Sequence, residues 1–210
     1  MLQFVKATGL PVALPLALTN AVVFQETPSP RVLAFAAACA VFAYGGDRLG
    51  DGLRADGGGG VVDHRGVVAA EINPKDDFYA YVREHSSLLA SCVLASFAVL
   101  QVYFAHHWAL SLLLLPSIRY ERLKRLAVGV KPAYVGAMWS AAAVFVPGVV
   151  EHGLSWGDAS LQAAPVALLF FAASTCADVE DVAEDTFNGV PTLPVALGVL
   201  RAQTIAAAAA

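Results

Sequence analysis

Seven apolar runs, separated by polar segments, constrain the fold of this chain more than any other feature of its sequence. They cover residues 8–24, 32–46, 87–104, 108–118, 132–150, 160–177 and 192–210. A membrane-spanning helix needs about 20 predominantly apolar residues, and the shortest runs can reach that length through their polar flanks. Charged residues make up 14% of the chain, far below the roughly 25% of soluble domains. The sequence therefore predicts one all-α domain over residues 1–210, a polytopic transmembrane helix bundle.

The order of the runs predicts which polar segments meet. The segments after the second, fourth and sixth runs leave the membrane on one side, and they cover residues 47–51, 119–125 and 178–185. The same side takes every Lys and Arg except Arg31 and Arg201. Because cytoplasmic loops carry the excess of basic residues, we expect this side to face the cytoplasm, or the stroma or matrix of an organelle. Residues 52–72 on this side are rich in glycine and predict a flexible loop.

The strongest chemical signal is an acidic stretch directly after the sixth run. No Lys or Arg lies between Lys131 and Arg201 to neutralise it. If the helix continues through it, Asp178, Asp181 and Asp185 are spaced i, i+3 and i+7 and share one face. Hard divalent cations bind such carboxylates, and Mg²⁺ usually does so together with substrate phosphates. The alternative is a solvated acidic loop between two helices.

Two further polar sets are expected at the same end of the bundle. Their carboxylates and basic or phenolic side chains are Asp47, Asp51, Arg48, Arg119, Tyr120, Lys124 and Arg125. Two carboxylate sets with basic side chains between them suit a diphosphate that is bridged to the protein by Mg²⁺, since Lys and Arg bind the remaining phosphate oxygens. A diphosphate with an apolar tail would leave that tail among the helices, which explains why such a site would lie in a membrane.

The motifs resemble those of the UbiA family of intramembrane prenyltransferases. Asp181 and Asp185, followed by Gly189 and the sequence TLPVALG at residues 192–198, are similar to the family's second aspartate motif. The segment DRLGD at residues 47–51 resembles its first aspartate motif, and Tyr120 with Lys124 matches its YxxxK element. The resemblance covers most of the chain, with the motifs in the family's order.

The resemblance implies a nine-helix fold of which this chain contains about seven, so that the C-terminal helices are missing. It implies Mg²⁺-dependent transfer of a prenyl group from a prenyl diphosphate to a lipophilic acceptor, either an aromatic ring or a tetrapyrrole-like molecule. The implied catalytic residues are Tyr120 and Lys124. The implied diphosphate-binding residues are Arg48, Arg119, Lys124 and Arg125. The implied metal ligands are Asp47, Asp51, Asp178, Asp181 and Asp185.

Two other functions fit parts of the sequence. Ala43 and Tyr44 stand where the family normally has Asn and often Asp, which suits a catalytically inactive UbiA-like membrane protein that binds prenyl lipid or partners. A cation transporter would use the acidic residues as an ion path, but it should carry acids in the middle of its spans, whereas here they lie at the ends of apolar runs. The charge pattern does not resemble a nucleic-acid-binding surface, so membrane lipid, prenyl diphosphate and acceptor are the expected partners.

Overall fold

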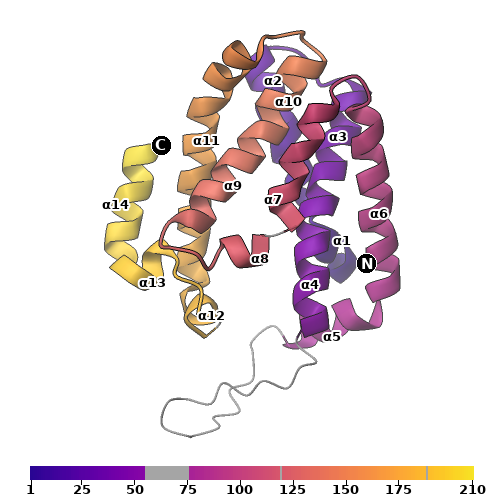
Figure 1. Ribbon diagram of the computed structural model, residues 1–210. Coiled ribbons are helices and arrows are strands. Elements are labelled where there is room, and N and C mark those ends of the chain that lie inside the picture. The colour runs from indigo at the N-terminus through magenta and orange to yellow at the C-terminus, as the bar shows by residue number, and fades with distance from the viewer. Residues whose placement is uncertain (55–75, 119, 188) are drawn as a thin grey trace, which may run out of the picture.

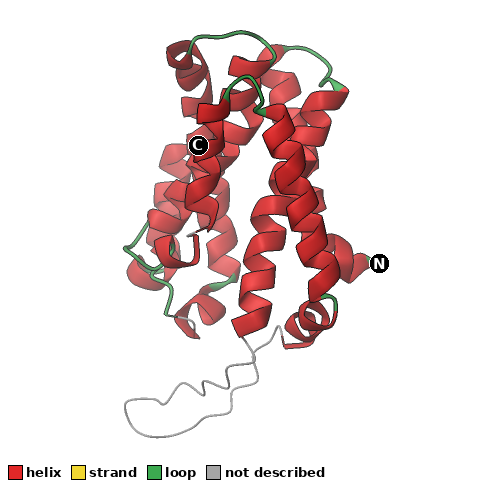
Figure 2. Cartoon of the chain, turned by 45° about the vertical axis from the view of Figure 1, so that its right-hand side comes forward, coloured by secondary structure: helices red, strands yellow, loops and turns green. Residues whose placement is uncertain are grey.

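The computed structural model describes residues 1–54, 76–118, 120–187 and 189–210, and over these residues it contains helices and no strand (Figures 1 and 2). The α-helices are α1 (Leu2–Thr8), α2 (Ala13–Phe24), α3 (Pro30–Ala40), α4 (Gly46–Arg54), α5 (Asp76–Glu84), α6 (Ser86–Tyr103), α7 (Leu115–Ile118), α8 (Tyr120–Leu123), α9 (Val130–Ser140), α10 (Val146–Val150), α11 (Trp156–Glu180), α12 (Val182–Phe187), α13 (Leu193–Leu197) and α14 (Val199–Ala209). The predicted all-α helix bundle is confirmed for this part of the chain.

Two π-helical segments join shorter helices into long ones. Segment η2 (Val41–Gly45) connects α3 to α4, and η5 (Ala141–Phe145) connects α9 to α10. Two 3₁₀ segments, η1 (Leu10–Val12) and η4 (Trp108–Leu114), precede α2 and α7. Asp47 therefore lies in the first turn after a π-helical segment, a kind of irregularity that is frequent at functional sites.

Four described helices are long and apolar enough to span a membrane, namely Pro30–Gly50, Ser86–Tyr103, Val130–Val150 and Trp156–Glu180. A fifth span is possible if Leu2–Thr8 and Leu10–Phe24, which meet at an angle of 63°, count as one. The other two predicted runs differ from single spanning helices. The fourth gives the shorter apolar helix Trp108–Ser117, and the seventh is divided into α13 and α14 at Gly198, whose φ of +84° ends the first of them.

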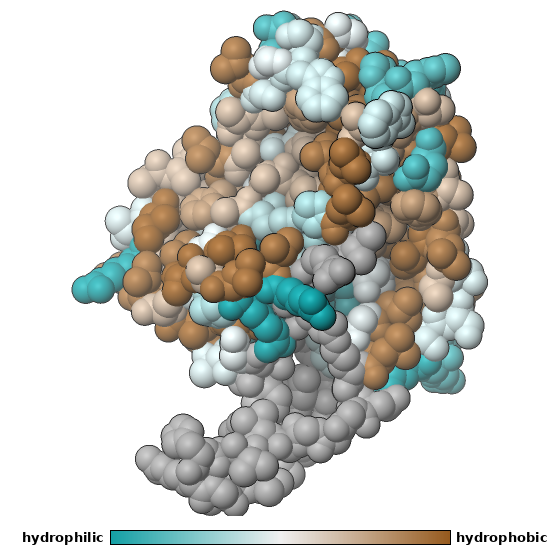
Figure 3. All heavy atoms as spheres, viewed as in Figure 1, coloured by the Kyte–Doolittle hydropathy of each residue, from teal (hydrophilic) through white to brown (hydrophobic). Residues whose placement is uncertain are grey.

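The outer surface of the bundle is largely apolar. Large hydrophobic side chains are exposed along α2, α6 and α11, among them Val22, Val102 and Leu161. On the face seen in Figure 3, apolar groups cover much of the middle of the molecule, while hydrophilic groups gather near its upper end and again in its lower part. A surface of this kind suits helices that contact lipid, in agreement with the predicted membrane association.

Helices α9 and α11 pack against each other closely enough to position the polar end of the bundle. A side chain on Gly136 of α9 would place its Cβ atom 2.6 Å from the carbonyl oxygen of Ala167 in α11. Small residues permit this close approach of backbones in membrane bundles. The two helices run in opposite directions (Figure 1), so the start of α9 lies beside the end of α11. Helices α4, α8 and α12 also lie toward this end.

Candidate functional site

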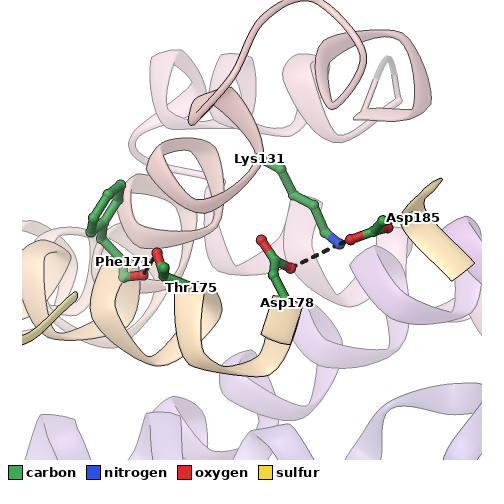
Figure 4. Close-up of polar contacts among 5 residues, drawn as sticks. All are labelled: Lys131, Phe171, Thr175, Asp178 and Asp185. Carbon is green, nitrogen blue, oxygen red and sulfur yellow. Dashed lines mark hydrogen bonds and ion pairs between the residues drawn. The ribbon is translucent and has the colours of Figure 1, made fainter. Parts of the chain in front are cut away.

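The acidic stretch lies at the end of α11. The helix ends at Glu180, Asp181 leaves the helical conformation with φ −94° and ψ 7°, and α12 begins at Val182. A single continuous helix over this stretch, the condition under which the three aspartates would share one face, is therefore interrupted at Asp181. Because the chain turns there, Asp178 and Asp185 approach one side chain from two different helices (Figure 4).

That side chain is Lys131, in the first turn of α9. Its Nζ atom lies 2.8 Å from Oδ1 of Asp178, 3.1 Å from Oδ2 of Asp185 and 3.3 Å from Oδ1 of Asp185 (Figure 4). The side chains of Asp178 and Asp185 are only 3% and 9% exposed, and that of Lys131 is 17% exposed. Asp178 and Asp185 thus share a buried ammonium group. The sequence interpretation missed Lys131, although it is the nearest basic residue before the acidic stretch.

One carboxylate oxygen of this group has no partner. Oδ2 of Asp178 is buried and makes no hydrogen bond to any described residue, and the same holds for the hydroxyl of Thr192. An unsatisfied buried acceptor costs about 1–3 kcal/mol, and more when it is charged. A bound cation or hydrogen-bond donor at Oδ2 of Asp178 would remove that cost.

The segment after α12 supports the same contact. The backbone N–H of Val190 donates a hydrogen bond of 2.8 Å to the carbonyl oxygen of Asp185. Leu193 is buried, and its Cδ2 atom lies 3.9 Å from the position of a Cβ on Gly129, the residue before α9. Leu193 therefore lies close to the residue before α9, and the Val190 hydrogen bond joins the chain after α12 to the backbone of Asp185.

Tyr120 of α8 links the two acidic sets. Its ring stacks on Tyr134 of α9 with centroids 5.0 Å apart, and the Nζ atom of Lys124 lies 5.6 Å from its ring centre. Burial raises the pKa of Tyr120 well above its usual range, and the negative charges of Asp47 and Asp178 raise it further. Asp47 from α4 and Asp178 from α11 therefore both lie within electrostatic range of Tyr120. The first and second acidic sets thus lie toward the same end of the bundle.

A second aromatic pair lies nearby. Tyr44 of η2 stacks on Trp139 of α9 with centroids 5.5 Å apart. It also interacts electrostatically with Asp47 and Lys131. Its Cβ atom packs directly against Gly9, which has φ +68° and where any side chain would collide with Tyr44. Tyr44 therefore fills space between the bend after α1 and helix α9.

The remaining predicted residues are distributed as follows. Arg48 follows Asp47 in α4, and its guanidinium lies 5.7 Å from the ring centre of Phe78 in α5. Lys124 and Arg125 follow directly after α8. Asp51 belongs to α4, but its side chain lies outside the described part of the structure, as do Arg119 and most of the predicted loop at residues 52–72.

The predicted magnesium ligands do not form a complete metal site among the described residues. Among them, no group of three or more His, Cys, Asp or Glu side chains is gathered closely enough to hold a metal ion. Lys131 already contacts both oxygens of Asp185 and one oxygen of Asp178. The carboxylate oxygen that suits a cation is Oδ2 of Asp178, which is buried and unpartnered among these residues.

No family model matches this chain, and no curated protein or solved structure matches it either. The resemblance to the UbiA family therefore stays a prediction from the motifs.

Proposed function

We propose that this chain is a UbiA-like intramembrane prenyltransferase, which moves a prenyl group from a prenyl diphosphate to a lipophilic acceptor with an aromatic or tetrapyrrole-like ring. The observation that carries this proposal is that the acidic ends of α4 and α11 lie at one end of an apolar helix bundle, with Tyr120 within electrostatic range of both Asp47 and Asp178. A diphosphate bound at that end would leave its prenyl chain among the helices. The same end would face the cytoplasm, or the stroma or matrix of an organelle, because it carries the basic residues.

The side chains around Tyr120 suit a diphosphate. Lys124 lies over the ring of Tyr120, and Arg125 follows it. Ammonium and guanidinium groups form strong charge-assisted hydrogen bonds with phosphate oxygens. Tyr120, whose pKa is raised, keeps its proton at neutral pH and can donate a hydrogen bond to the same ligand.

A magnesium ion, when bound, would neutralise negative charge on the departing diphosphate. Asp47, Asp51, Asp178 and Asp181 are the carboxylates proposed to hold it, with Asp178 contributing its unpartnered Oδ2 atom. Preorganised positive charge at a leaving group commonly supplies a large part of the rate enhancement in transfer reactions.

Aromatic side chains of the protein also suit the reacting allylic carbon of the prenyl group. When the bond between the allylic carbon and the diphosphate oxygen breaks, the carbon becomes positively charged, the acceptor attacks it and the acceptor then loses a proton. Aromatic faces attract such a cation, and two stacked pairs, Tyr44 with Trp139 and Tyr120 with Tyr134, come from neighbouring elements. The helix bundle would exclude water, which would otherwise capture the cation.

The test is transfer of a labelled prenyl group by the protein in vesicles with Mg²⁺, using two or three prenyl chain lengths and a panel of aromatic and tetrapyrrole acceptors. We expect product with the wild type and losses of about 100-fold or more in Lys124→Ala and Tyr120→Phe. Ser91→Ala, an exposed change in α6, is the control and should keep full activity. Full activity in both site variants would contradict the proposed roles.

A catalytically inactive UbiA-like protein is the second candidate, because Tyr44 is packed against Gly9 at a position where the family carries a polar residue. Such a protein would bind a prenyl diphosphate analogue without releasing diphosphate from the substrate. A cation transporter is less well supported, since the acidic residues of the described spans lie near span ends.

A further inference from the structure

In the group formed by Lys131, Asp178 and Asp185, the carboxylates already have a positively charged partner, unlike those of an empty metal site. Two carboxylates from α11 and α12 contact one ammonium group from α9, and all three side chains are largely buried. Three of the four carboxylate oxygens lie within 3.3 Å of the ammonium nitrogen. The fourth, Oδ2 of Asp178, is buried and has no hydrogen-bond partner among the described residues.

An ammonium group and a divalent cation compete for this position. Magnesium needs carboxylate oxygens at about 2.0–2.1 Å in near-octahedral geometry. An ion that bridged Asp178 and Asp185 through these oxygens would compete for them with the Nζ atom of Lys131, which already lies within 3.3 Å of all three. Two positive charges so close together in a partly buried site repel each other strongly, so Lys131 and a bridging metal ion exclude each other.

We propose that Lys131 is the built-in counterion of Asp178 and Asp185, occupying the position that a bridging divalent cation would otherwise take. Asp185 is then a positioning residue, which holds α12 against α9, and is not a metal ligand. The Oδ2 atom of Asp178 remains as the acceptor for an added cation or donor. This assignment concerns charge pairing alone, so it goes beyond the proposed prenyl transfer and is independent of it.

Removing the ammonium group should convert the pair of carboxylates into a divalent-cation site. In Lys131→Met, two buried carboxylates would lose their counterion while the methionine keeps most of the side-chain volume. A small divalent cation could then enter between them. Lys131→Arg keeps the positive charge and should gain no such site.

The experiment uses Mn²⁺ as the probe, with the full chain purified in detergent and free Mn²⁺ measured by electron paramagnetic resonance. We expect Asp185→Asn to change the Mn²⁺ affinity of the wild type by less than about threefold, because a true ligand would cost about 10-fold or more. We expect Lys131→Met to bind one additional Mn²⁺ and to gain thermal stability from it. Both the additional Mn²⁺ and the gain in thermal stability should disappear in the double variant Lys131→Met, Asp185→Asn. Asp158→Asn, far from the site, is the control and should leave Mn²⁺ binding unchanged.

Two results would overturn the assignment. One is a 10-fold or larger loss of Mn²⁺ affinity when Asp185→Asn is made in the wild type. The other is a folded Lys131→Met protein that gains no Mn²⁺. If Lys131→Met does not fold, wild type and Asp185→Asn titrated with Mn²⁺ over the same range decide the question: equal binding, including none in either protein, supports the assignment, and weaker binding by Asp185→Asn overturns it. Neither readout needs a prenyl substrate, so failure here is distinguishable from failure of the prenyl-transfer assay.

Discussion

The ammonium nitrogen of Lys131 lies 2.8 Å from Oδ1 of Asp178, which ties the first turn of α9 to the last turn of α11. The same ammonium reaches Asp185 in α12 at 3.1 Å. One cation thus connects three helices at the end of the bundle where the candidate site lies.

Lys131→Met should lower the free energy of unfolding by about 3–5 kcal/mol, because it leaves two buried carboxylates without their counterion. The measurement is equilibrium unfolding in detergent micelles without divalent cations. Lys6→Met changes an exposed lysine in α1 and should cost less than about 0.5 kcal/mol. A loss below about 1 kcal/mol in Lys131→Met would show that the buried pairs are not a substantial part of the stability.

Gly136→Ala should destabilise the packing of α9 on α11 by about 1–3 kcal/mol, because the new methyl group would press on the backbone of α11. Thermal unfolding in detergent measures the effect. Gly157→Ala is the matched control, since a Cβ at Gly157 would meet only the Oγ atom of Ser155 at 3.8 Å. Equal melting temperatures for the two variants would mean that the backbones of α9 and α11 do not touch at Gly136.

Tyr120 should resist deprotonation in the folded protein. Its pKa is raised by burial and by Asp47 and Asp178, so the folded state keeps a proton that an unfolded tyrosine loses near pH 10. The stability due to Tyr120 is therefore fully present below about pH 10 and declines as the pH rises from there toward the folded-state pKa.

Phenolate absorbance measured against pH, in wild type and Tyr120→Phe, tests this behaviour. The two titration curves should coincide up to about pH 11 while the protein stays folded, because Tyr120 does not ionise in that range. If the wild type gains one more phenolate than the variant near pH 10, Tyr120 is solvated and its pKa is not raised by burial and the two carboxylates.

The end of the bundle that carries Lys124 should face the cytoplasm, or the stroma or matrix if the protein lies in an organelle. In a variant without its native cysteines, we expect Lys124→Cys to react with a membrane-impermeant maleimide only after the cells are permeabilised. His107→Cys, in the turn after α6, should react in intact cells. The reverse pattern would place the candidate site on the opposite side of the membrane.

Much of the fold follows from the sequence because helix and membrane constraints are local. Four of the seven apolar runs mark described helices long enough to span a membrane, and α4, α8 and α12 lie toward one end of the bundle, as the order of the runs predicts. The bend in the first run and the division of the last one are less visible, since each depends on one glycine with a positive φ, Gly9 and Gly198. Glycine permits that conformation without requiring it.

The pairing at the site could not be predicted in the same way. Residues 131 and 178 lie far apart in the chain, and their contact depends on the close packing of α9 against α11 at Gly136. The role of Tyr44 likewise depends on which element faces it, and its packing against Gly9 and Trp139 is a tertiary property. Motif spacing identifies the carboxylates but does not identify the cation that neutralises them.

The most direct test of the site is the turnover of a labelled prenyl diphosphate in vesicles with Mg²⁺ by the wild type, Asp47→Asn and Asp178→Asn. If the ends of α4 and α11 hold one diphosphate between them, the wild type releases diphosphate with its acceptor and each variant is slower by about 100-fold or more. Turnover at the wild-type rate in both variants, or none by the wild type with any acceptor of the panel, would contradict the proposal.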